Sequence, residues 1–294
     1  MAPHRIQRFY RVITEGYNQK MKGATKNLLA IVAIVVATLL IVHLYSKTKG
    51  KAMVIVEPRK HELLKYVCEN FDNNMCKSWD LYVFHGKSHG SFAEEATEEI
   101  RKGGRKVFLM PLDTDNLTAD EYNRLLKRLD FWDRVKAEDI LVFQTDTVLC
   151  GNSDHKIREF TKYDYVGCSN HKNTIGDLGN NWGTDKNGYW SDDTTKNLSF
   201  YGVGGLSFRK NSFQKKCIRD YPNIHPEYAE DVFFSGCLEK SQNKPRDVSA
   251  LRNFCTQNVF YSRSFGAHKI SVMKEDQRAA FFEFCPAAIK IKDA

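Results

Sequence analysis

The sequence has eight cysteines but no CxxC pair, and this absence argues against a structural zinc site. An even number of cysteines permits disulfides in an oxidising compartment. It equally permits buried thiols, which pack as small hydrophobic side chains. The cysteine content alone therefore leaves both states open.

Excess positive charge is missing from most of the chain. The net charge of +8 lies entirely within residues 1–51, which hold nine Lys and Arg residues and one acidic residue. The remaining residues contain equal numbers of basic and acidic side chains, so they lack the basic excess that binds a phosphate backbone. We therefore expect no nucleic-acid partner.

Residues 28–45 contain no Asp, Glu, Lys or Arg and consist mainly of Ile, Val, Leu and Ala. A helix of this length spans about 27 Å, close to the roughly 30 Å hydrocarbon core of a bilayer. The Lys-rich residues 46–51 that follow do not resemble a signal-peptide cleavage site. We therefore predict a basic cytoplasmic tail at residues 1–27, one transmembrane signal anchor at 28–45 and a short linker at 46–51.

The side of the membrane that holds residues 52–294 is less directly indicated. Lysines flank the apolar segment on both sides, so the positive-inside rule gives nearly equal counts. Asn116 and Asn197 each begin an Asn-x-Ser/Thr triplet, which fits a luminal domain. We expect a type II, single-pass membrane protein whose catalytic domain lies in an ER-like or Golgi-like lumen.

Residues 52–294 have a length that suits one large α/β domain. Apolar, strand-like runs alternate with segments of helical spacing, and this alternation predicts a Rossmann-like, mostly parallel sheet flanked by helices. The strands are expected at residues 52–56, 81–84, 106–110, 141–150, 163–168 and 201–209, and the helices at 61–71, 92–102, 118–135, 212–219 and 227–238.

Residues 169–199 break this alternation. The segment is rich in Asn, Gly, Asp and Thr and carries Trp182, Tyr189 and Trp190. Loops of this length in a compact domain are usually functional or disordered. The three aromatic side chains could stack on a sugar or close over a ligand, and they could equally pack against the domain.

Asp146 lies toward the carboxyl end of the apolar strand at residues 141–150. Because open α/β sheets bind ligands outside the carboxyl ends of their strands, this carboxylate is placed to meet a metal ion or a phosphate. Asp146 could instead cap the turn that leaves the strand. Phosphatases that form an aspartyl phosphate carry a similar strand, but Gln144 occupies the nucleophile position here, and an amide cannot be that nucleophile.

Three further segments would join Asp146 if they reach the same edge of the sheet. These are Gly204-Gly205-Leu206-Ser207, Glu230-Asp231 and Gly266-Ala267-His268. Paired glycines allow a close approach of the backbone to a ligand, and they also occur at strand bulges. Paired acids could act chemically or could favour the dipole at a helix start.

The order of these segments resembles the nucleotide-sugar glycosyltransferases of the GT-A fold, and most closely an uncharacterised glycosyltransferase-like family. The match covers about residues 52–270. The segments that carry it are Glu57-Pro58-Arg59, Tyr122-Asn123, Phe131-Trp132, Phe143-Gln144-Thr145-Asp146, Gly204-Gly205-Leu206-Ser207-Phe208-Arg209, Glu230-Asp231-Val232-Phe233-Phe234 and Gly266-Ala267-His268.

The resemblance implies a donor site with a divalent cation. Asp146 and His268 would hold Mn²⁺ or another divalent cation, which would neutralise the diphosphate leaving group. A UDP-sugar is the favoured donor. The residues expected to line the nucleotide-sugar site are Glu57, Arg59, Gln144, Asp146, Gly204 and Gly205.

The Glu230-Asp231 pair matches the catalytic carboxylates of such enzymes. Asp231 would take the proton from the acceptor hydroxyl of a glycan, glycoprotein or glycolipid, with inversion at the sugar as the expected outcome. A structural role for Asp231 would leave a retaining route open. One residue departs from the pattern, because Gln144 replaces the first Asp of the Asp-x-Asp metal motif and hard cations prefer anionic oxygens. An inactive, membrane-anchored GT-A-like binding or scaffold protein is therefore the alternative.

Overall fold

The computed structural model of the protein describes residues 31, 32, 34–36, 38, 50–169, 201–221, 228–258, 260, 261 and 263–294. The chain divides into two compact units, residues 1–49 and 50–294. In the first unit, the few described residues are helical. Among the helices that are described, none combines the length and the apolar composition needed to cross a membrane.

Several predicted features lie outside the described residues. They are the tail, most of the anchor and of the linker, the aromatic residues of the 169–199 segment, and the sequon at Asn197. Lys51, the last residue of the predicted linker, already belongs to the first strand.

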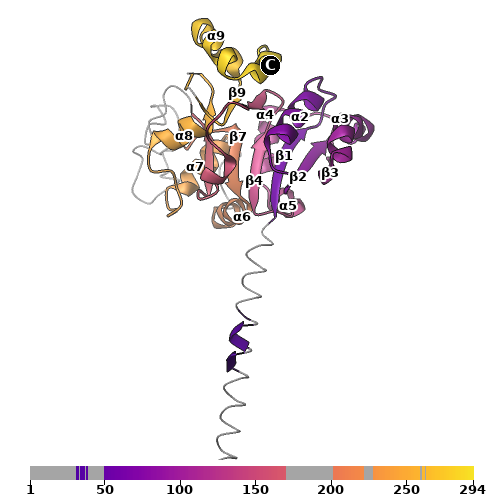
Figure 1. The fold of residues 1–294 in the computed structure, drawn as a ribbon. Helices are drawn as coiled ribbons and strands as arrows, with labels where there is room; N and C mark the ends of the chain where they lie inside the picture. The colour runs from indigo at the N-terminus through magenta and orange to yellow at the C-terminus, as the bar shows by residue number, and fades with distance from the viewer. Residues whose placement is uncertain are drawn as a thin grey trace, which may run out of the picture. The chain divides into compact units, whose positions relative to one another are not determined.

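A six-stranded sheet forms the centre of residues 50–294 (Figure 1). Its strands, in spatial order, are β3 (Val107–Pro111), β2 (Trp79–His85), β1 (Lys51–Glu57), β4 (Asp139–Phe143), β7 (Val203–Lys210) and β6 (Tyr165–Cys168). The first four strands are parallel neighbours, whereas β7 is antiparallel to both β4 and β6. The predicted α/β fold with a mostly parallel sheet is confirmed.

A second, three-stranded sheet contains β5 (Thr147–Leu149), β9 (Gly266–His268) and β8 (Cys255–Thr256). The prediction of one strand at residues 141–150 is wrong, because this region holds two strands, β4 and β5. The chain turns between β4 and β5, where the backbone N–H and the hydroxyl of Thr147 donate to the carbonyl of Gln144 at 3.2 and 2.6 Å. The turn transfers the chain from the large sheet to the small one.

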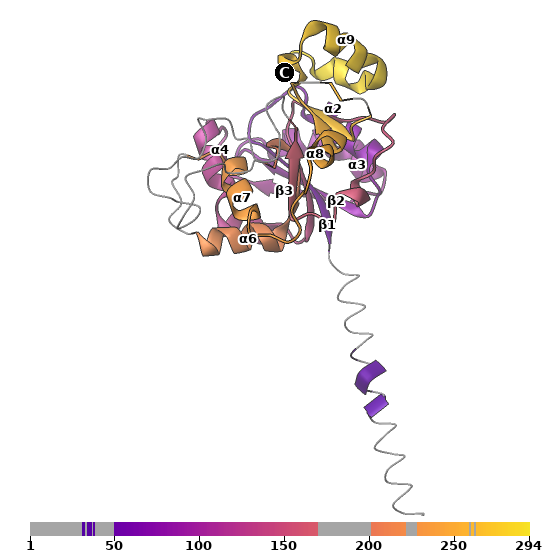
Figure 2. The ribbon, with the colours of Figure 1, turned by 90° about the vertical axis from the view of Figure 1, so that its left-hand side faces the viewer.

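Helices cover both faces of the large sheet (Figure 2). The helices described within residues 50–294 are α2 (Leu64–Asn74), α3 (Gly90–Lys102), α4 (Ala119–Leu126), α5 (Leu129–Arg134), α6 (Asn211–Asp220), α7 (Glu230–Leu238), α8 (Val248–Phe254) and α9 (Glu275–Phe284), with 3₁₀ turns η1 (Ile157–Glu159), η2 (Ile270–Val272) and η3 (Pro286–Ile291). Of these, α9 lies apart from the large sheet, beside η3. Alternate residues of β1 supply the two cores. Met53 and Ile55 join the core formed with α2 and α3, and Val54 and Val56 join the core formed with α5 and α7.

The helix predicted at residues 118–135 is in fact two helices, α4 and α5. It begins as predicted at a capping box, in which the Thr118 hydroxyl accepts from the Glu121 N–H and the Glu121 carboxylate accepts from the Thr118 N–H. It breaks after Leu126, whose carbonyl accepts from the indole N–H of Trp132 at 2.7 Å. Burial of Trp132 thus overrides the continuous helical spacing.

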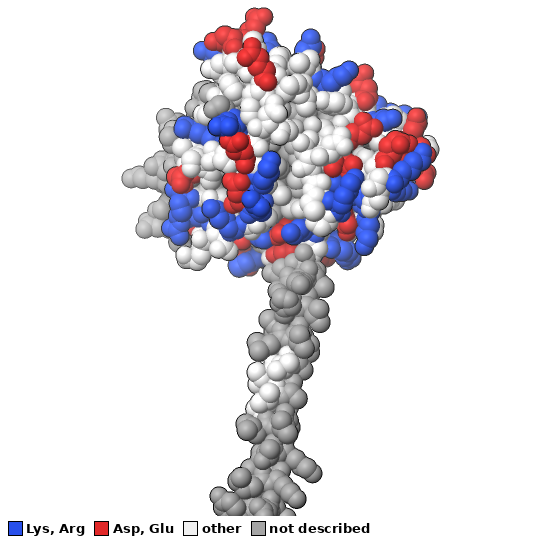
Figure 3. Space-filling view, viewed as in Figure 1, with Lys and Arg blue, Asp and Glu red and all other residues white. Residues whose placement is uncertain are grey.

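Charges of both signs are interspersed on the face of residues 50–294 that Figure 3 shows. Lys and Arg side chains alternate with Asp and Glu side chains there, and uncharged surface separates the groups. This distribution agrees with the equal numbers of basic and acidic residues beyond residue 51.

The structure decides the question of the cysteines. Disulfides join Cys150 to Cys285 and Cys168 to Cys255. Cys68, Cys217 and Cys237 are buried thiols, and Cys76 is an exposed thiol. Both disulfides close long loops, with sequence separations of 135 and 87 residues.

We expect a thiol-specific reagent to modify four cysteines in the unreduced, denatured protein but only Cys76 in the native protein. Intact-mass spectrometry measures both numbers. A disulfide that closes a loop of this length stabilises the folded protein by about 4 kcal/mol. Reduction should therefore lower the unfolding temperature markedly. Modification of all eight cysteines without a reductant would contradict this pairing.

Candidate functional site

A cavity of about 530 Å³ opens at the carboxyl ends of β1 and β4. Its walls include the first turn of α4, the start of β7, the first turn of α7 and the end of β9. It contains every residue that the sequence analysis assigned to the site, namely Glu57, Arg59, Gln144, Asp146, Gly204, Gly205, Glu230, Asp231 and His268. The fold therefore gathers these residues from five separate segments at one edge of the sheet.

The small sheet brings Asp146 and His268 together. Thr147 of β5 pairs with His268 of β9, and the Lys269 N–H donates to the Asp146 carbonyl at 2.9 Å. As a result, Asp146 Oδ2 lies 3.4 Å from His268 Nε2. The other ring nitrogen, His268 Nδ1, lies 3.2 Å from Oε1 of Gln257.

Asp146 is a mostly buried carboxylate with an unused acceptor. Burial opposes its ionisation, but the hydrogen bond and the charge of His268 outweigh burial and lower the pKa of Asp146. Its Oδ1 atom is buried without a hydrogen-bond partner in the described structure. Buried polar atoms normally have a partner, so Oδ1 is suited to accept a ligand.

The two glycines of β7 make room for neighbouring side chains. A Cβ atom on Gly205 would lie 2.2 Å from His268 Nε2, and one on Gly204 would lie 1.9 Å from Glu230 Oε1. We expected these glycines to admit a ligand. Both do line the cavity, but the space beside each is occupied by the imidazole or the carboxylate.

Glu230 is held by a fully buried arginine. The guanidinium of Arg209 donates to both carboxylate oxygens of Glu230, at 2.6 and 2.8 Å. Arg209 is in β7 and Glu230 begins α7, so this ion pair fastens the helix start to the sheet. Glu230 is itself 4 % exposed.

Asp231, the next residue, has the opposite pKa shift from Asp146. Its Oδ2 accepts from the Gly204 N–H at 3.1 Å, and its Oδ1 accepts from the Val232 N–H at 2.8 Å. Burial and the negative charge of Glu230 raise the pKa of Asp231 to about 6. Asp231 is therefore a carboxylate that exchanges protons close to neutral pH.

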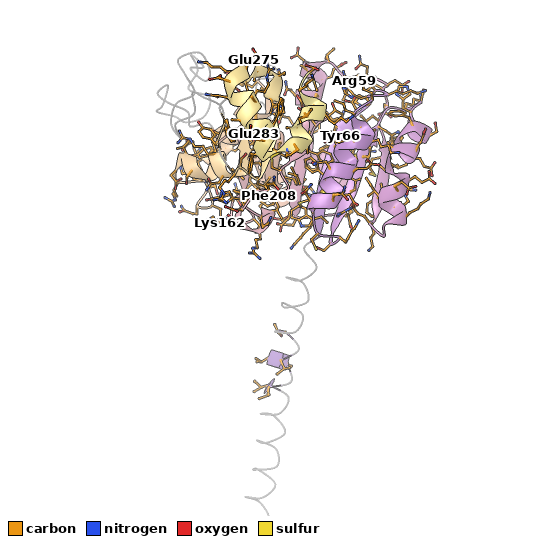
Figure 4. All side chains as sticks on the ribbon, turned by 45° about the horizontal axis from the view of Figure 1, so that its top comes forward. Arg59, Tyr66, Lys162, Phe208, Glu275 and Glu283 are labelled. Carbon is orange, nitrogen blue, oxygen red and sulfur yellow. A yellow bond between two sulfur atoms is a disulfide. The ribbon has the colours of Figure 1, made fainter. Side chains whose placement is uncertain are left out.

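An ion pair lines the cavity where the chain leaves β1. Two nitrogens of the Arg59 guanidinium each donate to one oxygen of Glu57 at 2.8 Å, and the Arg59 backbone N–H also donates to Glu57. Glu57 is buried at the end of β1, whereas the Arg59 side chain is 55 % exposed. Figure 4 shows Arg59 at the rim of the domain.

Sequence reasoning left four residues of the site without a role. Asn123 accepts from the Glu230 N–H at 3.1 Å, and Gln257 contacts His268. Arg209 holds Glu230. The hydroxyl of Tyr122, a residue that lines the cavity, is buried without a hydrogen-bond partner among the described residues. A signal existed for Arg209, because an arginine inside an apolar strand requires a buried partner.

The residues present fit a divalent cation in part. Asp146 and His268 supply one carboxylate and one imidazole, and Asp146 Oδ1 is an unpartnered acceptor. Within the described parts of the chain, no group of three or more His, Cys, Asp or Glu side chains is close enough to hold a metal ion. A cation bound here would need further oxygens from a ligand.

Comparison with solved structures finds distant similarity to several glycosyltransferases. Galactosyltransferase LgtC, in complex with donor and acceptor sugar analogues, is 8 % identical with a TM-score of 0.48, over 83 % of this chain and 97 % of that one. Core-mannan synthase A of Aspergillus fumigatus, in an Mn/GDP form, is 10 % identical with a TM-score of 0.42, over 69 % and 72 %. TarS 1–349 of S. aureus, in complex with UDP-GlcNAc, is 12 % identical with a TM-score of 0.39, over 64 % and 53 %. Similarity at this level says nothing about the activity of this chain.

No curated protein matches the sequence. Residues 107–268, more than half of the chain, match the family described as "Protein of unknown function (DUF5672)". The matched residues run from the start of β3 to the end of β9, so they include every cavity segment except the end of β1 and the terminal residue Ala294. The chain therefore belongs to the DUF5672 family.

Proposed function

We propose that this protein is a glycosyltransferase that transfers a sugar from a nucleotide-sugar donor to a hydroxyl acceptor. The observation that carries the proposal is the placement of two unlike aspartates at one cavity. The pKa of Asp146 is lowered, and the pKa of Asp231 is raised to about 6. Environments that separate two carboxylates in this way are typical of sites that divide acid–base work from charge stabilisation.

Asp231 is the proposed general base. In its ionised form it takes the proton from the acceptor hydroxyl as the oxygen forms a bond to the anomeric carbon of the donor. The bond between that carbon and the diphosphate breaks, and the nucleoside diphosphate leaves with the bonding electrons. A base with a pKa near 6 is ionised at neutral pH and still accepts a proton readily. Inversion at the anomeric carbon is the proposed outcome.

Asp146 and His268 are the proposed ligands of a divalent cation such as Mn²⁺. Such a cation supplies positive charge that stabilises the diphosphate leaving group. The lowered pKa keeps Asp146 ionised, and Gly205 leaves the space that the His268 ring needs. The hydrogen bond that His268 Nδ1 donates to Oε1 of Gln257 fixes the orientation of that ring.

Glu57 and Arg59 are the proposed nucleotide end of the site, with a UDP-sugar as the favoured donor. The bidentate pair with Glu57 holds the Arg59 guanidinium at the cavity, where its positive charge suits an anionic ligand. Gln144, Gly204 and Gly205 line the same cavity. A glycan, glycoprotein or glycolipid hydroxyl is the proposed acceptor.

We further propose a luminal, membrane-anchored protein, with residues 28–45 as the anchor. Two disulfides support an oxidising compartment of the ER or Golgi type, since disulfides are rare in the cytosol. Asn116, in the first sequon, is exposed and so accessible to a glycan. The alternative function, an inactive binding protein, is favoured by Gln144, a neutral residue where the metal motif has its first carboxylate.

Donor turnover tests the proposed function. We would incubate the purified full-length protein with UDP- and GDP-sugars, with and without Mn²⁺, and measure nucleotide release. We expect release with at least one donor, stimulated by Mn²⁺ and reduced about 100-fold or more in Asp146→Asn, because the amide loses the anionic oxygen that a hard cation prefers.

Asp154→Asn is the matched control, because Asp154 is a surface aspartate paired with Arg263 outside the cavity. It should behave like the parent protein. If a donor binds without turnover and Asp146→Asn binds it equally well, the inactive binding protein is the better description.

A further inference from the structure

We propose that the ion pair between Arg209 and Glu230 is the device that positions Asp231. Arg209 and Glu230 are then positioning residues, and Glu230 does not react with substrate. The inference rests on the proposed function, in which Asp231 is the base. It assigns a role to Arg209, which sequence reasoning left without one, and it revises the expectation that Glu230 is catalytic.

Arg209 is built into the domain with its hydrogen-bonding groups occupied. Its side chain is fully buried, its Nε donates to the Ser207 hydroxyl at 2.8 Å, and its Nη2 donates to the Gly204 carbonyl at 3.3 Å as well as to Glu230. Three aromatic rings surround the guanidinium carbon. The distance from Arg209 Cζ to the ring centroid is 5.8 Å for Trp132, 5.2 Å for Tyr165 and 5.6 Å for Phe234. Such a planar, enclosed cation has little freedom to move.

The same short segment of β7 contacts both acids of α7. Arg209 binds Glu230, and the Gly204 N–H donates to Asp231 Oδ2 at 3.1 Å. The Gly204 carbonyl in turn accepts from Ser207 and from Arg209. Asn123, on α4, accepts from the Glu230 N–H and holds the helix start from the other side. Asp231 is therefore fixed by β7 directly and through its neighbour Glu230.

Glu230 is poorly placed to take a proton from substrate. Both of its carboxylate oxygens accept hydrogen bonds from Arg209, and the approach over Gly204 is so tight that a Cβ there would lie 1.9 Å from Oε1. A buried carboxylate in a bidentate pair loses a large stabilisation if the pair opens. The geometry thus separates the two acids. Glu230 is bound by a guanidinium, whereas the hydrogen bonds to the Asp231 carboxylate within the described residues come from backbone N–H groups.

The charges around Asp231 make this role measurable. Glu230 raises the pKa of Asp231 and Arg209 lowers it, while Tyr122 and Tyr165, whose own pKa values are raised by burial, remain neutral near pH 7. Glu230→Gln keeps a hydrogen-bonding side chain opposite Arg209 but removes the negative charge. We therefore expect the pKa of Asp231 to fall by about 1 unit or more in this variant.

The experiment is a ¹³C NMR titration of the aspartate carboxyl carbons in the full-length protein, with Asp231→Asn used to identify the Asp231 signal. Glu283→Gln, at an exposed position on α9, is the matched control and should leave the titration of Asp231 unchanged (Figure 4). An unchanged Asp231 titration in Glu230→Gln would overturn the inference whether or not any sugar is transferred. A failure of the proposed function would instead appear as the expected pKa shift in a protein that turns over no donor.

Kinetics add a second readout. In Glu230→Gln, the acid limb of the pH dependence of kcat/KM should move to lower pH, with transfer retained at neutral pH. A loss of transfer of 100-fold or more at every pH, in a folded protein, would instead make Glu230 catalytic.

If Glu230→Gln does not fold, Glu230→Asp keeps the charge and shortens the side chain. It should leave the pKa of Asp231 raised and lower kcat, and unchanged kcat would refute the positioning role.

Discussion

Asp231→Asn is expected to reduce sugar transfer by about 1,000-fold, because the amide cannot accept the proton of the acceptor hydroxyl. The substitution keeps the size of the side chain and leaves Glu57 and Arg59 untouched, so the affinity for the nucleoside diphosphate should not change. Steady-state kinetics and calorimetric titration with the nucleotide measure the two quantities separately. Equal losses of transfer and of nucleotide affinity would point to a collapsed site instead of a missing base.

The pH dependence of the parent protein provides a related check. Transfer should decline as the pH falls through about 6, because protonation of Asp231 removes the base. The stability effect has the opposite direction. A pKa raised from 3.8 to about 6 means that the protonated acid stabilises the fold at low pH, and that about 3 kcal/mol of this stabilisation is lost as the pH rises through 6.

Asp231→Asn stays neutral at every pH and avoids that loss. Part of this gain in stability is offset, because the amide NH₂ group would face a backbone N–H group and two donors cannot form a hydrogen bond. We therefore expect the variant to be at least as stable as the parent protein at pH 8, as measured by urea unfolding. A variant that is inactive but not destabilised identifies Asp231 as functional. A large loss of stability at pH 8 would make Asp231 a structural residue.

Arg209→Met is expected to lower the free energy of unfolding by about 3–5 kcal/mol. The change leaves the carboxylate of Glu230 buried without its cation, and an uncompensated buried charge is strongly destabilising. Urea unfolding at pH 7.5 measures the difference. Arg128→Met is the matched control, because Arg128 pairs with Asp130 on the surface, with exposed fractions of 61 and 64 %, and surface pairs contribute little.

The double variant Arg209→Met, Glu230→Met separates the ion pair from simple packing. With both charges removed, neither position leaves an unpaired buried charge, so most of the stability should return. Asp231 would nevertheless lose its positioning, so transfer should stay low. A double variant as unstable as Arg209→Met would show that packing of the guanidinium among its aromatic neighbours, and not the pairing of charges, stabilises this region.

Much of the site was predictable because each segment carries its own local signal. Asp146 follows an apolar strand, Gly204 and Gly205 lie near the start of another, and Glu230 and Asp231 begin a helix. In a mostly parallel sheet the strand ends that carry such residues meet at one edge. That geometric rule, applied to the sequence, placed Asp146, Gly204-Gly205, Glu230-Asp231 and His268 together, and all of them line the cavity.

The errors arose where a distant contact overrides a local pattern. Apolar spacing continued through residues 141–150 and through 118–135, but the first region divides between two sheets and the second is broken by the burial of Trp132. The pairing of the cysteines was open for the same reason. Cys150 and Cys285 are 135 residues apart, and nothing local to either one indicates the other.

The sequence by itself determined the α/β alternation, the location of the positive charge and the residues that meet at the sheet edge, because these depend on local composition and on the period of apolar residues. Only the tertiary structure decided the surroundings of each acid. Glu230 and Asp231 are neighbours with similar side chains. In the folded protein Arg209 binds Glu230, whereas burial and the charge of Glu230 raise the pKa of Asp231 to about 6. Desolvation and charge pairing depend on atoms brought together by folding, so the difference between the two acids exists only in the folded protein.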